Sequence, residues 1–145
     1  IISIDTSGSM EGKPEEIAKS LLVQILQMDK KKKRKCFLIT FSVHTKILEI
    51  SKPGHWHKVK EFLKKSFTGG TDGEEMLTNI INALNTKDYS MADALIISDF
   101  EFSSPLSMTR KKILHEQTKG THFYGLQIGR GNNEYKNLLD KIWQI

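Results

Sequence analysis

Three oxygen-bearing side chains follow an apolar run at the start of the chain. Residues 1–4 are hydrophobic apart from one serine, and Asp5, Ser7 and Ser9 come next at alternate positions. Gly8 lies between the two serines and lets the backbone turn tightly. This pattern predicts a strand that delivers oxygen ligands into a loop. Carboxylate and hydroxyl oxygens suit a hard divalent cation better than zinc, which favours thiolates and imidazoles, so we expect a magnesium-type site.

A second acidic residue follows another apolar run. Residues 92–98 contain Ala-Leu-Ile-Ile and lead into Asp99 in the way that the first strand leads into Asp5. In open α/β sheets, ligands bind beyond the carboxyl ends of the strands, where the connections reverse direction. We therefore expect both carboxylates to face one crevice. The glycine-rich loop 67–73 can approach closely through its double glycine and deliver the Thr71 hydroxyl to a fixed point, although an ordinary loop is the competing interpretation.

The elements of the first half follow from hydrophobic periodicity. Pro14 and the glutamates after it mark the start of a helix that ends in the basic run 30–35. The apolar positions of this helix are Ile17, Leu21, Ile25 and Met28, widened by Ala18, Leu22 and Leu26. Residues 36–41 form a near-continuous apolar run, which predicts a central strand covered on both faces. Residues 45–50 follow too soon for a helical crossover, so we expect an antiparallel edge strand, closed by Pro53 and Gly54.

The second half continues the alternation of helices and strands. Its apolar faces and turn residues predict helices at 55–65, 74–84 and 107–119, a strand at 121–128, a turn at 129–133 and a closing helix at 135–142. Leu138, Leu139 and Ile142 would face inward from the closing helix, with Trp143 packing where it docks. His55 and His57, two apart on a helix, point in different directions and are interpreted as surface residues.

Composition limits the class of protein. The chain of 145 residues has 38% hydrophobic residues and a net charge of +5, which fits one domain and does not establish nucleic-acid binding. Cys36 has no partner for an internal disulfide and predicts a buried thiol in a reducing compartment. The sequence has no signal peptide and no apolar stretch of membrane-spanning length. The sequence lacks an initiator Met and begins directly with a strand, so we expect it to be a piece of a longer protein. The basic run 30–35 is interpreted as a solvated helix end rather than a surface that binds polyanions.

Taken together, Asp5-x-Ser7-x-Ser9, Thr71 within Gly-Gly-Thr-Asp, and Asp99 within Ile-Ser-Asp-Phe resemble the metal-ion-dependent adhesion site of von Willebrand factor A (VWA) domains. The resemblance covers nearly the whole chain as a single VWA domain, 1–145, expected to be a C-terminal fragment. It implies an α/β fold, with a three-layer doubly wound (Rossmann-like), mostly parallel sheet, one antiparallel edge strand and helices on both faces. The motif surroundings also resemble intracellular VWA proteins of the CoxE and ViaA type, which work with MoxR-type AAA+ ATPases.

The resemblance implies a role for each of the five residues. Ser7 and Ser9 would bind the cation directly, and Thr71 directly or through water. Asp5 and Asp99 would act mostly through waters, or as direct ligands in one state. Mg²⁺ is the expected cation, and Mn²⁺ or Ca²⁺ also fit such ligands.

Three functions compete at this point. The first is a non-enzymatic, cytoplasmic binding module that docks an Asp or Glu of a protein partner, such as a MoxR-type ATPase, onto the cation, with no nucleic acid and no direct membrane insertion. The second is a Mg²⁺-dependent phosphoryl-transfer enzyme with Asp5 as nucleophile, which lacks an evident acid/base partner in the sequence. The third is nucleic-acid binding through the basic run, which no interleaved aromatic residues support.

Overall fold

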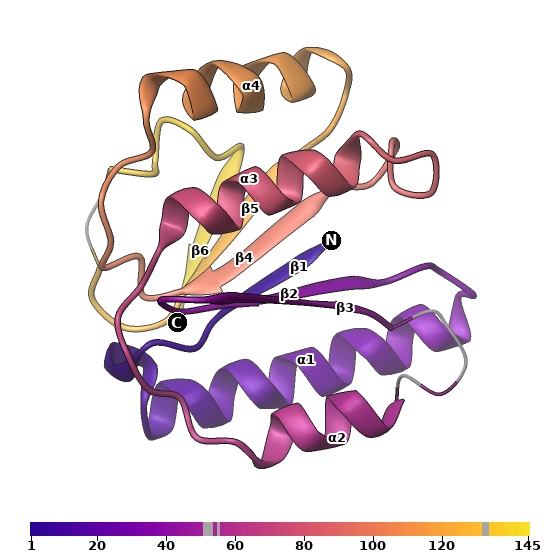
Figure 1. The fold of residues 1–145 in the computed structure, drawn as a ribbon, viewed down its shortest axis with the longest axis vertical. Helices are drawn as coiled ribbons and strands as arrows, with labels where there is room; N and C mark the ends of the chain where they lie inside the picture. The colour runs from indigo at the N-terminus through magenta and orange to yellow at the C-terminus, as the bar shows by residue number, and fades with distance from the viewer. Residues whose placement is uncertain (51–53, 55, 132–133) are drawn as a thin grey trace.

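The fold is a single mixed sheet between two layers of helices. The computed structural model describes residues 1–50, 54, 56–131 and 134–145. Within them, six strands form one sheet in the order β3-β2-β1-β4-β5-β6, in which β3 pairs antiparallel with β2 and the other pairings are parallel (Figure 1). The strands are β1 Ile2–Asp5, β2 Phe37–Phe41, β3 Thr45–Glu49, β4 Ala94–Ser98, β5 Phe123–Gln127 and β6 Lys141–Gln144. The expected doubly wound sheet with an antiparallel edge strand is confirmed.

Helices cover both faces of the sheet. They are α1 Lys13–Lys31, α2 Trp56–Lys64, α3 Gly73–Leu84 and α4 Ser107–Thr118, and a short 3₁₀ turn, η1, spans Gly8–Met10. Figure 1 shows α1 and α2 on one face and α3 and α4 on the other. The predicted helix starting near Pro14 and the helices of the middle of the chain are thus confirmed within one or two residues.

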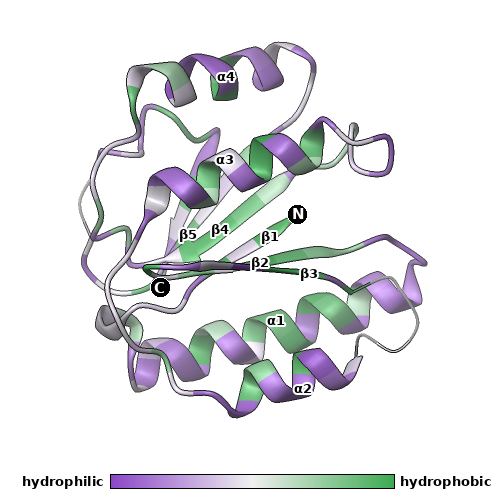
Figure 2. Ribbon diagram, in the orientation of Figure 1, coloured by the Kyte–Doolittle hydropathy of each residue, from purple (hydrophilic) through white to green (hydrophobic). Residues whose placement is uncertain are grey.

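The core is divided by the sheet into two apolar clusters. Ile2 and Ile4 of β1 pack with α1 and α2, whereas Ile39 and Ile96 of the neighbouring strands pack with α3 and α4. Figure 2 shows the hydrophobic stripes of the helices turned toward the sheet. Cys36 is buried as predicted, and its burial raises the pKa of the thiol to about 12.

The apolar stripe of α1 is narrower than its sequence pattern predicts. Ala18, Leu22 and Leu26 are fully buried and form its centre, since residues four apart lie on one side of a helix. Met28 was expected inside but is 52% exposed. It lies two residues beyond Leu26, a rotation of about 200° around the helix axis, and so faces away from the sheet.

Some expected features fall on residues that the structure does not describe. These are Pro53 in the closure of the edge strand, His55 at the start of the second helix, and Asn132 and Asn133 in the late turn. His57 is described, and it is exposed on α2 with Nδ1 2.5 Å from the carbonyl oxygen of Gly54, which agrees with its interpretation as a surface residue.

The closing helix predicted at 135–142 is wrong, because the chain forms turns there and then the edge strand β6. Asp140 directs this change: its N–H donates to the Phe123 carbonyl at 2.8 Å, and its carboxylate accepts from the Phe123 N–H at 2.7 Å. These bonds start β6 beside β5, and an eight-residue helical pattern is too short to compete with pairing to a sheet.

The apolar residues of this segment nevertheless reach the core. Leu138 and Leu139 are buried from the turns, and Ile142 packs half-buried from β6. Trp143, predicted to pack against a docked helix, lies instead on β6, 43% exposed, with its ring 5.5 Å from that of Tyr124. None of the helices in the described ranges has the length and apolar content needed to cross a bilayer.

Asp140→Asn should weaken the docking of β6. Partial burial alone would raise the pKa of Asp140, but hydrogen bonds from the Phe123 N–H and the Gln117 amide outweigh it, and the net pKa lies below the ordinary 3.8. A lowered pKa means that the carboxylate stabilises the fold above the unfolded-state value, and that this contribution is lost as pH falls through the folded-state pKa. We expect the variant to lose about 1 kcal/mol or less in urea unfolding near pH 7.

The difference between wild type and Asp140→Asn should diminish as pH falls through the folded-state pKa of Asp140, below which the carboxyl is protonated in both states. Asp88→Asn is the matched control, because Asp88 forms an exposed ion pair with Lys35 that contributes little. An equal loss in the two variants would contradict the assigned role of Asp140.

Candidate metal centre

Asp5 lies at the carboxyl end of β1 and joins it to the opening loop and to β4. It is fully buried. One carboxylate oxygen, Oδ1, accepts the Ser7 N–H at 2.9 Å, and Oδ2 accepts the Ser98 hydroxyl at 2.6 Å. Both oxygens of the carboxylate therefore have donors, one from its own loop and one from the neighbouring strand.

The pKa of Asp5 is raised above its ordinary 3.8. Burial is the largest cause, because it disfavours the charged form, and the nearby charge of Asp99 adds to the rise. The hydrogen bonds from Ser7 and Ser98 act in the opposite direction. Two carboxylates thus share one poorly solvated region, an arrangement that a cation would stabilise.

The two loop serines present their hydroxyls side by side. Ser7 is buried just before η1 and Ser9 lies exposed within it, and their Oγ atoms are 3.1 Å apart. Neighbouring ligands of an octahedral Mg²⁺, each about 2.1 Å from the ion, are themselves about 3 Å apart. The pair already has the spacing of one edge of such an octahedron.

The double-glycine loop is held against the opening loop by two backbone hydrogen bonds. Thr68 N–H donates to the Thr6 carbonyl at 2.9 Å, and Gly8 N–H donates to the Gly69 carbonyl at 2.8 Å. Gly69 has a φ of +94°, which glycine adopts freely. Thr71 follows in the same loop and is half-buried. Among the described residues, no hydrogen bond joins its side chain to the other four candidate residues.

The residue after Thr71 has a separate role. The side chain of Asp72 accepts the Glu75 N–H at 2.9 Å and caps the start of α3. Its own N–H donates to the carbonyl oxygen of Ser42 at 2.8 Å, in the turn between β2 and β3. Asp72 therefore anchors the loop that carries Thr71 at its C-terminal side.

Asp99 sits at a sharp turn after β4. It is 6% exposed, and its Oδ1 accepts the Glu101 N–H at 3.0 Å. Phe100 has a left-handed φ of 59°, a conformation that costs a non-glycine residue about 1–3 kcal/mol. The ring of Phe100 is buried against Phe102 and Tyr135, at centroid distances of 5.9 and 5.6 Å, and this packing holds the turn.

Two supporting residues have no role in the sequence interpretation. Ser98 is fully buried, donates to Asp5 and accepts the Phe100 N–H at 2.8 Å, so it positions both acidic residues. A hydroxyl directly before an acid at a strand end was the available signal. Gly131 lies so close to the Asp99 carbonyl that a Cβ there would overlap it, a contact that only the fold reveals.

The donor set fits a hydroxyl-rich site. Within the described residues, no three His, Cys, Asp or Glu side chains cluster so as to hold a metal ion. A cation at the end of β1 would therefore need the hydroxyls of Ser7 and Ser9 as ligands in addition to carboxylates. Mg²⁺ accepts such oxygen ligands, whereas zinc prefers thiolates and imidazoles.

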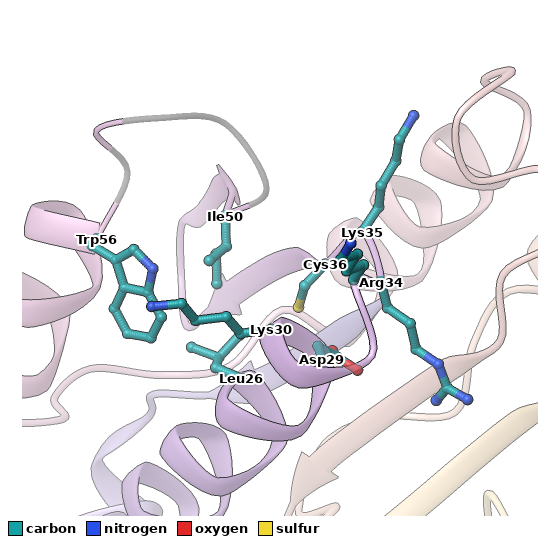
Figure 3. Close-up of a pocket in the computed structure, with 9 residues that line it drawn as sticks. Leu26, Asp29, Lys30, Arg34, Lys35, Cys36, Ile50 and Trp56 are labelled. Carbon is teal, nitrogen blue, oxygen red and sulfur yellow. The ribbon is translucent and has the colours of Figure 1, made fainter.

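A basic hollow lies near the opposite ends of these strands. Its volume is about 370 Å³, and it is lined by Leu26, Asp29, Lys30, Lys33, Arg34, Lys35, Cys36, Ile50 and Trp56. Figure 3 shows Lys30 reaching toward Trp56 while Arg34 and Lys35 extend in other directions. Lys35 pairs with Asp88 at 2.6 Å. The positive groups do not converge on one point, which favours a solvated helix end over an anion site.

The chain was compared with known protein families, sequences and structures. No family model matches the chain. Over its whole length, the chain is 30% identical in sequence to the regulatory protein ViaA of Proteus mirabilis. It spans only 30% of the length of that protein.

Solved structures share the fold. The von Willebrand factor type A structure from Catenulispora acidiphila superposes with a TM-score of 0.65 at 15% identity, covering 99% of this chain and 37% of that one. The manganese-loaded TRAP protein of Plasmodium vivax gives 0.64 at 20% identity, covering 94% and 59%. With this sheet order and these structural neighbours, the chain has the fold of VWA domains.

Proposed function

We propose that Asp5, Ser7, Ser9, Thr71 and Asp99 hold a divalent cation, with Mg²⁺ as the best fit and Mn²⁺ or Ca²⁺ as alternatives. The observation that carries the proposal is the pair of serine hydroxyls 3.1 Å apart beside two acidic strand ends. Ser7 and Ser9 would bind the ion directly. Asp5, whose oxygens already accept two hydrogen bonds, would act mostly through water molecules. The manganese-loaded state of the TRAP protein supports an ion in this fold.

Neutral hydroxyl ligands leave most of the ion's charge uncompensated. Such a cation attracts a further carboxylate and leaves a coordination position for it. The domain would then be a non-enzymatic module that docks an Asp or Glu of a protein partner. The name of the similar ViaA, a regulatory protein, supports a regulatory or adaptor role, and the family resemblance makes a MoxR-type AAA+ ATPase the partner to test.

Phosphoryl transfer through Asp5 is disfavoured by the geometry. A nucleophilic carboxylate must offer an oxygen to the attacked phosphorus. Asp5 is fully buried, with one oxygen bound to the Ser7 N–H and the other to the Ser98 hydroxyl. The hydrogen bonds that hold both carboxylate oxygens of Asp5 thus obstruct an attack on a substrate.

Ser7→Ala combined with Ser9→Ala should abolish Mg²⁺ and Mn²⁺ binding in calorimetric titration. The fold should persist, because the apolar clusters on both faces of the sheet do not use these hydroxyls. Ser20→Ala with Ser90→Ala is the matched control, since both residues are exposed and lie outside this loop, Ser20 on α1 and Ser90 in the turn before β4. Equal Mg²⁺ affinity in wild type and the Ser7/Ser9 variant would refute the assignment.

Mg²⁺ should also change how stability depends on pH. The folded-state pKa of Asp5 is raised, so the folded protein binds this proton more tightly than the unfolded chain does. Without metal, the free energy of unfolding should therefore fall as pH rises from about 4 through the folded-state pKa, and Asp5→Asn should remove that part of the decline.

Excess Mg²⁺ should offset the decline in wild type, because the ion binds only the folded state; a concentration of about 100 Kd adds about 2.7 kcal/mol. Urea unfolding at several pH values, with Mg²⁺ or with EDTA, measures both effects. A pH dependence of wild type that is the same in both solutions would argue against a cation beside Asp5.

A further inference from the structure

A groove runs beside the proposed metal site, between α2 and the β2–β3 hairpin. Its volume is about 440 Å³. The hairpin contributes Thr40, Ser42, His44, Lys46 and Leu48, α2 and its C-terminal end contribute His57, Lys58, Glu61, Phe62 and Lys65, and the loops contribute Thr6, Ser66, Phe67 and Thr68. Figure 1 shows this corner of the molecule, where α2 lies under β2 and β3.

The groove and the metal site share a wall. Thr6 lines the groove and stands between Asp5 and Ser7 in the opening loop. Its hydroxyl donates to the Phe41 carbonyl at 3.0 Å, and its own carbonyl accepts the Thr68 N–H at 2.9 Å. Thr68 also lines the groove and leads directly into the loop that carries Thr71. The groove therefore begins at residues that adjoin the candidate metal ligands in sequence.

The charge of the groove is positive. Lys46, Lys58 and Lys65 are exposed along it, against one carboxylate, Glu61. Glu61 already pairs with Lys64 at 3.2 Å, which further reduces its negative charge. An acidic ligand is thus complementary both to the cation and to the surface next to it.

The floor of the groove is apolar. Leu48 of β3 and Phe62 of α2 are half-buried and pack against the core cluster beneath α1 and α2. The groove's volume of about 440 Å³ is enough for a few side chains. The outer edge of β3 is the edge of the sheet, so an extended segment could lie along it.

We propose that this groove binds an extended acidic segment of the protein partner, with one carboxylate on the cation, further carboxylates beside Lys46 and Lys58, and an apolar side chain over Phe62. This inference rests on the proposed metal-dependent docking, and it specifies the kind of segment that the partner protein would present. A protein segment is favoured over a nucleic acid because the groove combines its lysines with an apolar floor, whereas a phosphate backbone would use the charge alone.

The test uses fluorescein-labelled octaglutamate as probe, with anisotropy measured in Mg²⁺ and in EDTA. Wild type should bind it only with Mg²⁺. Lys46→Gln with Lys58→Gln should weaken binding by about five- to tenfold, the effect of losing two exposed ion pairs, while calorimetric Mg²⁺ affinity stays unchanged. Lys58→Gln alone, on the exposed face of α2, should give a smaller loss in the same direction.

The matched control is Lys111→Gln with Lys112→Gln, which removes the same charge from exposed positions of α4 on the other face of the sheet. Equal loss in this control, no loss in the groove variant, or no Mg²⁺-dependent binding of octaglutamate overturns the groove. Binding of oligothymidylate as tight as octaglutamate and unaffected by EDTA overturns it in favour of a polyanion surface. If wild type binds no Mg²⁺ in calorimetry, the proposed function itself fails, which separates the two cases.

Discussion

The buried carboxylate of Asp5 is the constraint on which the site depends. Its two oxygens bind the Ser7 N–H and the Ser98 hydroxyl, and so tie the end of β1 to its own loop and to the end of β4. Burial of this group and the nearby charge of Asp99 both disfavour its charged form, and the hydrogen bonds from Ser7 and Ser98 only partly offset that cost. The proposed cation would offset this cost, because a positive charge beside the carboxylate favours its ionised form.

The remaining parts of the site are positioned by hydrogen bonds between loops, a helix cap and aromatic packing. Thr68 and Gly8 form hydrogen bonds across two loops that are about sixty residues apart in sequence, and Asp72 secures the far end of the second loop. The strained Phe100 turns the chain after Asp99 and is held by an aromatic cluster. These contacts hold the loops that carry two acidic residues, Asp5 and Asp99, and the candidate hydroxyl ligands. Under the proposed function, this oxygen-rich set would hold a cation whose coordination a partner's carboxylate completes.

Much of this architecture could be read from the sequence, because parallel strands buried on both faces leave apolar runs whose ends mark one edge of the sheet. That logic predicts Asp5, Ser7 and Asp99 at one edge of the sheet, and the strands that Asp5 and Asp99 follow, β1 and β4, do pair side by side. It was wrong at the closing helix, where the bonds of Asp140 to Phe123 outweigh a short helical pattern, and at Met28, whose position depends on where the centre of the helix stripe falls. The hydroxyl of Ser98 directly before Asp99 was a signal in the sequence, but its bond to Asp5 and the close approach of Gly131 depend on contacts between distant segments and could not be predicted.

The most direct test of the account is a crystal structure of the chain grown with Mn²⁺, with an anomalous difference map at the manganese absorption edge. The account predicts one strong peak beyond the end of β1, about 2.1–2.2 Å from the Oγ atoms of both Ser7 and Ser9, with Asp5 and Asp99 around it. A fully occupied ion bound elsewhere, or no peak at this edge of the sheet in the presence of excess Mn²⁺, would contradict it.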